Sequence, residues 1–74
     1  MRLKDIRNSK NLTQVQLAIK SGVNIRSIRA YEQGKKNINK AAGIILYKLS
    51  KALDCTIEDL LELDRTALKA KVDY

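Results

Sequence analysis

Arg26 and Arg29 are the side chains of this sequence best suited to recognising another molecule. Each guanidinium holds its N–H donors in a planar fork, which matches O6 and N7 of guanine as well as phosphate oxygens. Ile28 and Tyr31, three residues apart, share one face of a helix predicted over residues 25–32 and can bury that face. The residues left on the opposite face are Ile25, Arg26, Arg29 and Ala30.

A second short helix is predicted just before this one, and a tight turn joins the two within residues 13–33. Thr13 and Gln16 have the spacing of a capping box at a helix start. Gly22 stands where that helix must end in a left-handed residue, and Asn24 is a strong N-cap for the helix that follows. Two helices in this arrangement, with arginines on the outer face of the second, form a DNA-binding helix-turn-helix.

Positive charge is concentrated around this motif. Residues 1–40 contain ten basic residues and two acidic ones, a net charge of +8, whereas residues 41–74 contain five basic and six acidic, a net of −1. A generically basic surface is the alternative, but scattered charges would seldom place the whole excess beside one motif. The distribution favours a polyanion, here double-stranded DNA, as the partner.

Apolar spacing predicts five helices in all. Besides the two of the motif (14–20 and 25–32), we expect a first helix over residues 2–10 that buries Leu3 and Ile6 and keeps Lys4, Arg7 and Lys10 outside. After a loop over 33–39, a fourth helix is expected to start near Lys40, capped by Asn39, and to break at Asp54 and Cys55. A fifth follows, with N-cap chemistry from Thr56 and Asp59. The expected buried residues of these last two helices are Ala42, Leu46, Leu49, Leu53, Ile57, Leu60 and Leu61.

Over residues 2–63 the sequence resembles the phage-repressor-like (Xre/Cro-type) helix-turn-helix family. The resemblance implies an all-α fold, a compact five-helix lambda-repressor-like DNA-binding domain over 1–63, followed by a tail over 64–74. The residues that carry it are Leu3, Ile6, Leu12, Thr13, Gln14, Leu17, Ala18, Gly22, Val23, Ile28, Tyr31, Glu32, Gly34, Leu46, Tyr47, Lys48, Leu49, Ala52, Leu53, Ile57, Glu58, Asp59, Leu60 and Leu61.

The resemblance also implies which residues contact DNA. The base-contacting positions are Ile25, Arg26, Arg29 and Ala30, with Arg26 the best candidate for a guanine and Ile25 for a thymine methyl group. Contact with phosphates alone is the alternative for each arginine, and Arg29 in particular fits either a base or the backbone. Some members pair the glutamine of the second helix with a glutamine at the first recognition position, and Ile25 excludes that pair here.

Phosphate contacts are expected at helix N-termini and in the loop after residue 32. Gln14 matches the family position whose amide holds a phosphate, and the loop adds two cations, with an ordinary solvated turn as the alternative. This loop is about three residues longer than is usual in the family. The expected phosphate-contacting residues are Gln14, Asn24, Ser27, Lys35, Lys36 and Asn37.

Enzymatic and metal chemistry finds no support in the composition. The sequence has no histidine, and its one cysteine, Cys55, is expected to pack as a small apolar residue. We therefore expect no catalytic residue, no metal, no cofactor and no small-molecule substrate. The charged first ten residues do not form a signal peptide, and no apolar run has the length of a membrane span, so a cytoplasmic location without membrane contact is expected.

Dimerisation is expected because one recognition helix covers too few base pairs to mark a site in a genome. Residues 64–74 alternate apolar and charged side chains, which suits a strand paired with its symmetry mate, but an extension of the fifth helix or a disordered end fits equally. We expect four apolar residues not to be fully absorbed by the core: Ile19, Ile44, Ile45 and Tyr47. The predicted function is a repressor that binds a palindromic operator as a homodimer; the alternative is an antitoxin-like or adaptor protein with a protein partner.

Overall fold

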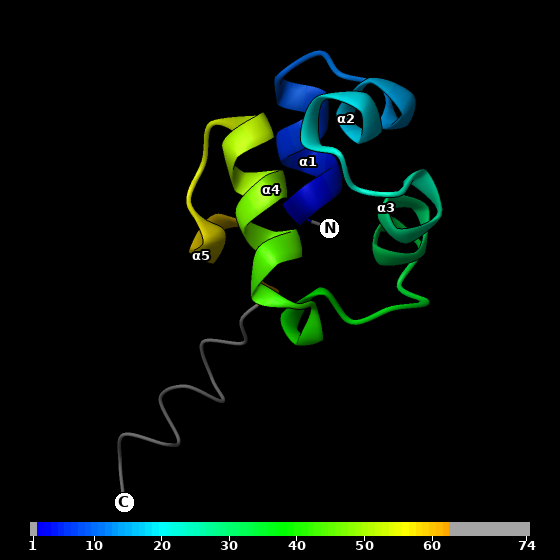
Figure 1. Ribbon diagram of the computed structural model, residues 1–74, viewed down its shortest axis with the longest axis vertical. Helices are drawn as coiled ribbons and strands as arrows, with labels where there is room; N and C mark the ends of the chain where they lie inside the picture. The colour runs from blue at the N-terminus through cyan, green and yellow to red at the C-terminus, as the bar shows by residue number, and fades with distance from the viewer. Residues whose placement is uncertain (1, 63–74) are drawn as a thin grey trace, which may run out of the picture.

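The computed structural model describes residues 2–62, and helices are the only regular secondary structure over this range (Figure 1). None of these helices is long and apolar enough to cross a membrane. The elements are α1 (Arg2–Ser9), α2 (Gln14–Ser21), α3 (Ile25–Glu32), the short 3-10 helix η1 (Ile38–Lys40), α4 (Gly43–Leu53) and α5 (Ile57–Leu60). The predicted all-α, five-helix fold is confirmed.

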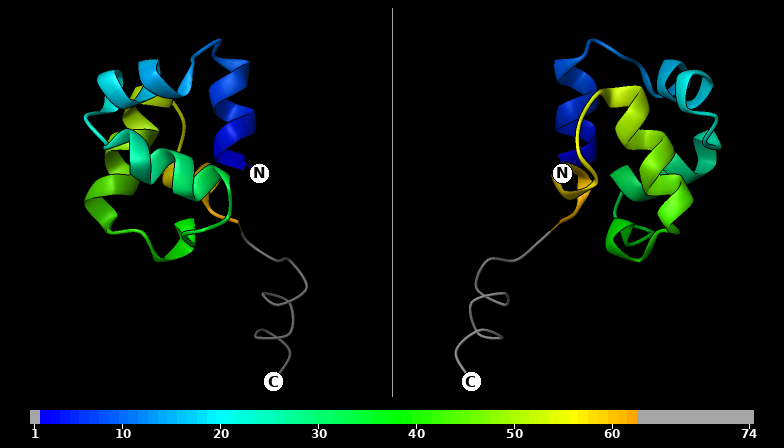
Figure 2. Two further views of the ribbon diagram at one scale, coloured as in Figure 1. Left: turned by 90° about the vertical axis from the view of Figure 1, so that its right-hand side faces the viewer. Right: turned by 60° about the vertical axis from the view of Figure 1, so that its left-hand side comes forward.

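One hydrophobic core joins the helices. Helix α4 packs against α2 and α5, while α1 packs against α3 and α5, and Figure 2 shows these contacts from two further sides. Leu17 of α2 and Leu49 and Leu53 of α4 are completely buried. Burying the apolar surface of each such side chain away from water contributes about 1.5–3 kcal/mol to the stability of the fold. The remaining core residues are Leu3, Val23, Ile28, Tyr31, Ile38, Leu46, Ala52 and Leu60.

The predicted caps of the helix-turn-helix are all present. The Thr13 hydroxyl accepts the backbone N–H of Gln16 (3.0 Å), and the Gln16 side chain accepts that of Thr13 (2.8 Å). Gly22 ends α2 with a φ of 74°, in the left-handed region that glycine adopts without a Cβ clash. Asn24 accepts the backbone N–H of Arg26 (2.8 Å) and so caps the start of α3. The angle between the two helices is therefore held by local hydrogen bonds as well as by the core.

The predicted start of the fourth helix is wrong. Helix α4 begins at Gly43, after Ala42, which makes no side-chain capping bond, and not near Lys40. Residues 38–40 form η1, which Asn37 caps through the backbone N–H of Asn39 (2.9 Å). The Asn39 side chain instead forms two hydrogen bonds of 2.8 Å with the backbone of Glu62, one donated and one accepted. A partner 23 positions away thus replaces the expected cap.

The predicted burial of α4 and α5 is correct in part. Leu46, Leu49, Leu53 and Leu60 are buried, and Leu61 is half-buried against the core. Ala42 is exposed because it precedes α4, and Ile57 is 37% exposed in the first turn of the short helix α5. The Thr56–Asp59 capping box of α5 is present, with hydrogen bonds of 3.0 and 3.1 Å. The strand or helix considered for residues 64–74 lies outside the described residues.

Candidate nucleic-acid interface

Helix α3 presents Arg26 almost directly away from the core. Ile28 and Tyr31 are buried on its inner face, and successive helical residues turn by about 100°, which places Arg26 nearly opposite both. Arg26 is exposed, and its guanidinium makes no hydrogen bond or ion pair within residues 2–62. The other outward positions are exposed Arg29 and half-buried Ile25 and Ala30. The four side chains expected to contact bases therefore lie on one outer surface of α3.

The loop after α3 brings several of the expected phosphate-contacting residues together. The backbone N–H groups of Lys35 and Lys36 both donate to the Ala30 carbonyl (2.9 and 3.2 Å), which holds these two exposed lysines beside the end of α3. Ser27, Lys36 and Asn37 line one surface hollow. Lys40, which is not among the expected phosphate-contacting residues, lines the same hollow. One flank of the outer surface of α3 is thus cationic.

Asn24 stands at the beginning of the same surface. Its side-chain oxygen is used for the α3 cap, and the residue is exposed. The NH2 group of the same amide is the part able to donate to a phosphate oxygen. Capping and phosphate contact are therefore compatible at this position.

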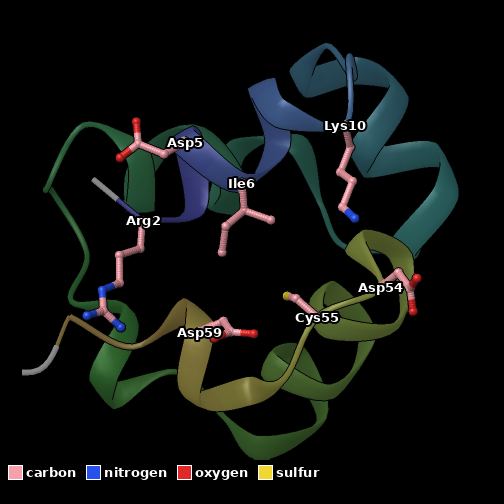
Figure 3. Close-up of a pocket in the computed structure, with 7 residues that line it drawn as sticks. All are labelled: Arg2, Asp5, Ile6, Lys10, Asp54, Cys55 and Asp59. Carbon is pink, nitrogen blue, oxygen red and sulfur yellow. The ribbon is translucent and has the colours of Figure 1, made fainter.

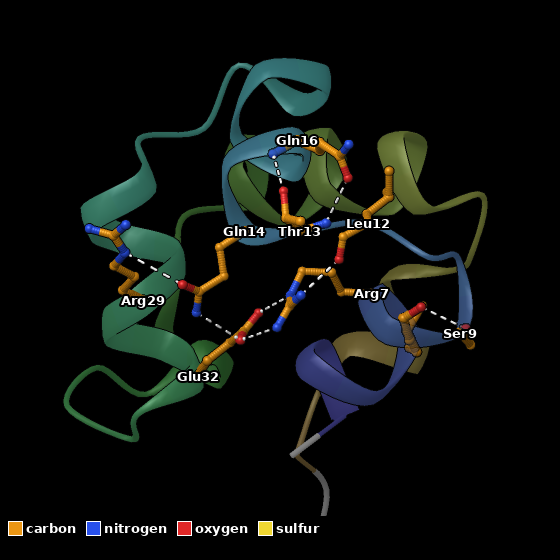
Figure 4. A network of polar contacts seen from close by, with 9 residues as sticks. Arg7, Ser9, Leu12, Thr13, Gln14, Gln16, Arg29 and Glu32 are labelled. Atoms are coloured by element: carbon orange, nitrogen blue, oxygen red, sulfur yellow. Dashed lines mark hydrogen bonds and ion pairs between the residues drawn. The ribbon is translucent and has the colours of Figure 1, made fainter.

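Gln14 and Arg29 lie on the opposite flank, where the first turn of α2 approaches α3 (Figure 4). The Gln14 side chain donates from Nε2 to Oε1 of Glu32 (3.0 Å), and its Oε1 accepts a longer hydrogen bond from Nε of Arg29 (3.4 Å). The structure does not join Gln14 to the cationic loop. Ile25 has no side-chain amide to bond Gln14, and Arg29 and Glu32 bond it instead.

Arg7 completes this network from α1, which the sequence had not predicted. Its Nε and Nη2 donate to the two carboxylate oxygens of Glu32 (2.8 and 2.9 Å), and its Nη1 donates to the Leu12 carbonyl (2.8 Å). The expectation that Arg7 points into solvent is wrong, since it is only 8% exposed. A charge buried to this degree is stable only when paired, so the ion pair ties α1 to the end of α3.

A sequence model of the helix-turn-helix family matches residues 3–60 of the chain. The protein belongs to this family, as an Xre/Cro-type helix-turn-helix protein. Comparisons with curated proteins and with solved structures gave no match. Family membership makes the protein a DNA-binding transcription regulator.

Another surface pocket of this helix-turn-helix regulator lies between α1 and the junction of α4 and α5 (Figure 3). Cys55 borders it, half-buried against the core as predicted, and burial raises the pKa of its thiol. The thiol is therefore poorly activated as a nucleophile. Within residues 2–62 no group of three or more histidine, cysteine or carboxylate side chains is placed to hold a metal ion. The pocket residues are Arg2, Asp5, Ile6, Lys10, Asp54, Cys55 and Asp59.

The Glu32 carboxylate should make the stability of the regulator fall in acid. Burial opposes ionisation of Glu32, but hydrogen bonds from Arg7 and Gln14 outweigh it and lower the pKa below the ordinary 4.5. The folded chain then binds fewer protons than the unfolded chain, so this stabilisation is complete above that ordinary value and is lost as the pH falls through the folded pKa.

We expect urea denaturation at a series of pH values to show a free energy of unfolding that decreases as the pH falls. This decrease should be less steep for Glu32→Gln. Hydrogen bonds from Thr56 also lower the pKa of Asp59, an exposed carboxylate that caps α5. Part of the loss of stability in acid therefore remains in Glu32→Gln. Parallel acid profiles for the wild type and Glu32→Gln would contradict the assignment.

Proposed function

We propose that this regulator is a repressor that recognises a palindromic operator as a homodimer. The observation that carries the proposal is the isolated guanidinium of Arg26 at the centre of the outer surface of α3. A donor group that is exposed, unpaired within residues 2–62 and flanked by cations on a rigid helix suits a base edge in the major groove. Occupation of promoter DNA would then be sufficient to block transcription.

The two flanks of α3 suit the two sides of a major groove. In this proposal, Arg26 contacts a base, and Ile25 and Ala30 provide apolar contacts. The DNA strand on the loop side of α3 has its phosphates bound by Ser27, Lys35, Lys36 and Asn37. Asn24 and Gln14 contact the other strand. Backbone contacts of this kind set the position of the helix, while the base contacts set the sequence preference.

Exposed apolar side chains support association with a second chain. Ile19 is 78% exposed on α2, and Ile44 and Tyr47 are 59% and 52% exposed on α4, whereas Ile45 is half-buried against the core. A homodimer would place two α3 helices about 34 Å apart on one face of the DNA. The same residues favour the second candidate, an antitoxin-like protein or adaptor that binds a different protein.

A fluorescence anisotropy titration tests the proposal. It compares DNA from upstream of the regulator's own gene with scrambled DNA of equal length, at two salt concentrations. We expect the native sequence to bind about a thousandfold more tightly, with the advantage kept at the higher salt concentration. Equal binding that salt abolishes for both would contradict sequence-specific regulation and favour the protein-partner candidate.

A further inference from the structure

The hydrogen bonds between Arg7, Glu32, Gln14 and Arg29 have one possible direction. An ionised carboxylate only accepts hydrogen bonds, so the Gln14 amide must turn its NH2 group toward Glu32. Its oxygen then faces the opposite way, where Nε of Arg29 donates to it. The buried pair with Arg7 fixes Glu32, and Glu32 in turn fixes the amide (Figure 4).

Arg29 and Arg26 therefore differ, although both are exposed on α3. The bond to Gln14, whose side chain extends from the first turn of α2, restrains Nε of Arg29, and the two terminal nitrogens point away from Gln14 and are left for another acceptor. Arg26 has no such restraint within residues 2–62. Two arginines on one helix thus start from different orientations before any DNA is bound.

We propose that Gln14 is a positioning residue that directs Arg29 to a backbone phosphate and away from the base edges. In helix-turn-helix complexes the second helix of the motif lies in the groove, while the first crosses the sugar–phosphate backbone. A guanidinium bonded on its Nε side to a residue of the first turn of α2 therefore has its terminal nitrogens available to the backbone. This inference rests on the proposed DNA binding and divides its tasks, with Arg29 providing affinity and Arg26 providing sequence preference.

The test uses the full-length chain and a pool of DNA duplexes with a randomised central segment. Sequences selected by the wild type are compared with those selected by Arg29→Ala and by Arg26→Ala. Lys48→Ala is the matched control, because it removes one exposed positive charge from α4. For Arg29→Ala we expect an unchanged base preference and, for each half-site bound, about tenfold weaker binding to all sequences and a salt slope reduced by about one unit.

The positioning role of Gln14 needs a second measurement. It uses Gln14→Met, which keeps the length of the side chain and removes its hydrogen bonds. We expect the Nε–H of Arg29 to exchange with water faster in this variant, as followed by NMR without DNA. Adding Arg29→Ala to the Gln14→Met variant should weaken DNA binding about threefold relative to Gln14→Met alone. This is less than the tenfold effect of Arg29→Ala in the wild type, because the two residues act together.

Each alternative outcome is decisive. A change of preference at one base pair in Arg29→Ala would make Arg29 a base-contacting residue, and fully independent effects of the two substitutions would remove the positioning role; either overturns the proposal. Binding of the wild type without sequence preference would contradict the proposed sequence-specific function. In that case, a smaller salt slope for Arg29→Ala than for Lys48→Ala would still support the phosphate contact. Absence of any DNA binding by the wild type would overturn both.

Discussion

Replacing Arg7 with methionine should lower the free energy of unfolding by about 3–5 kcal/mol, because it leaves the Glu32 carboxylate buried without its ionic partner. The side chains of both residues are largely shielded from water, 10% exposed for Arg7 and 3% for Glu32. A domain of this size has a total stability of only about 5 kcal/mol, so the loss would approach complete unfolding. Urea denaturation at neutral pH, followed by circular dichroism, measures it.

Two further variants separate the loss of the ion pair from the loss of a charge. Lys4→Met removes an exposed positive charge from the same helix and should change stability by less than about 0.5 kcal/mol. The double variant Arg7→Met, Glu32→Met removes both buried charges and should recover most of the lost stability, since apolar pairs often replace buried ion pairs at little cost. If Arg7→Met were as stable as Lys4→Met, the ion pair would have no structural role in solution.

Replacing Arg26 with alanine should remove sequence preference at one base pair in each half-site. A two-point guanidinium–guanine contact provides about 1–3 kcal/mol of discrimination, so a dimer with two copies would lose about 2–6 kcal/mol on its operator. Folding should be unaffected because the Arg26 guanidinium has no partner within residues 2–62. The measurement is an anisotropy titration against the operator and a set of operators with single base-pair changes.

Lys35→Ala is the matched control for this second prediction. It removes a cation from the loop beside α3 and should weaken binding to all the duplexes alike, with the base preference intact. Arg26→Ala should instead bind the original and the changed operator equally at one position. A uniform loss of affinity in both variants would assign Arg26 to the phosphate backbone.

The structural features that were predicted correctly depend on residues close together in the chain. Thr13 and Gln16 are three positions apart, and Asn24 bonds the backbone two positions later, so their cap geometry follows from spacing alone. Gly22 supplies the left-handed end of α2 for the same local reason. Placement of the outer residues of α3 also followed, because the apolar positions of one short helix determine which side faces out.

The features that were missed depend on distant pairs. Arg7 and Glu32 are 25 positions apart, and the spacing of α1 alone cannot show that an arginine beside Leu3 has an acidic partner. Asn39 had the right chemistry for a helix cap, but the backbone of Glu62 was the better-placed partner. One signal was present for Glu32: it is one of only two acidic residues in positions 1–40, and it follows the buried Tyr31.

The hydrogen-bonded chain from Arg7 to Arg29 has a consequence for how regulators of this kind diverge. Arg7 and Glu32 form a buried ion pair, so mutations at these two positions are expected to be tolerated mainly together. Arg26 is outside that chain, and its guanidinium bonds no residue among 2–62, so it is free to vary one mutation at a time. Duplicated copies of the gene could therefore acquire new operators through position 26 while keeping the same scaffold.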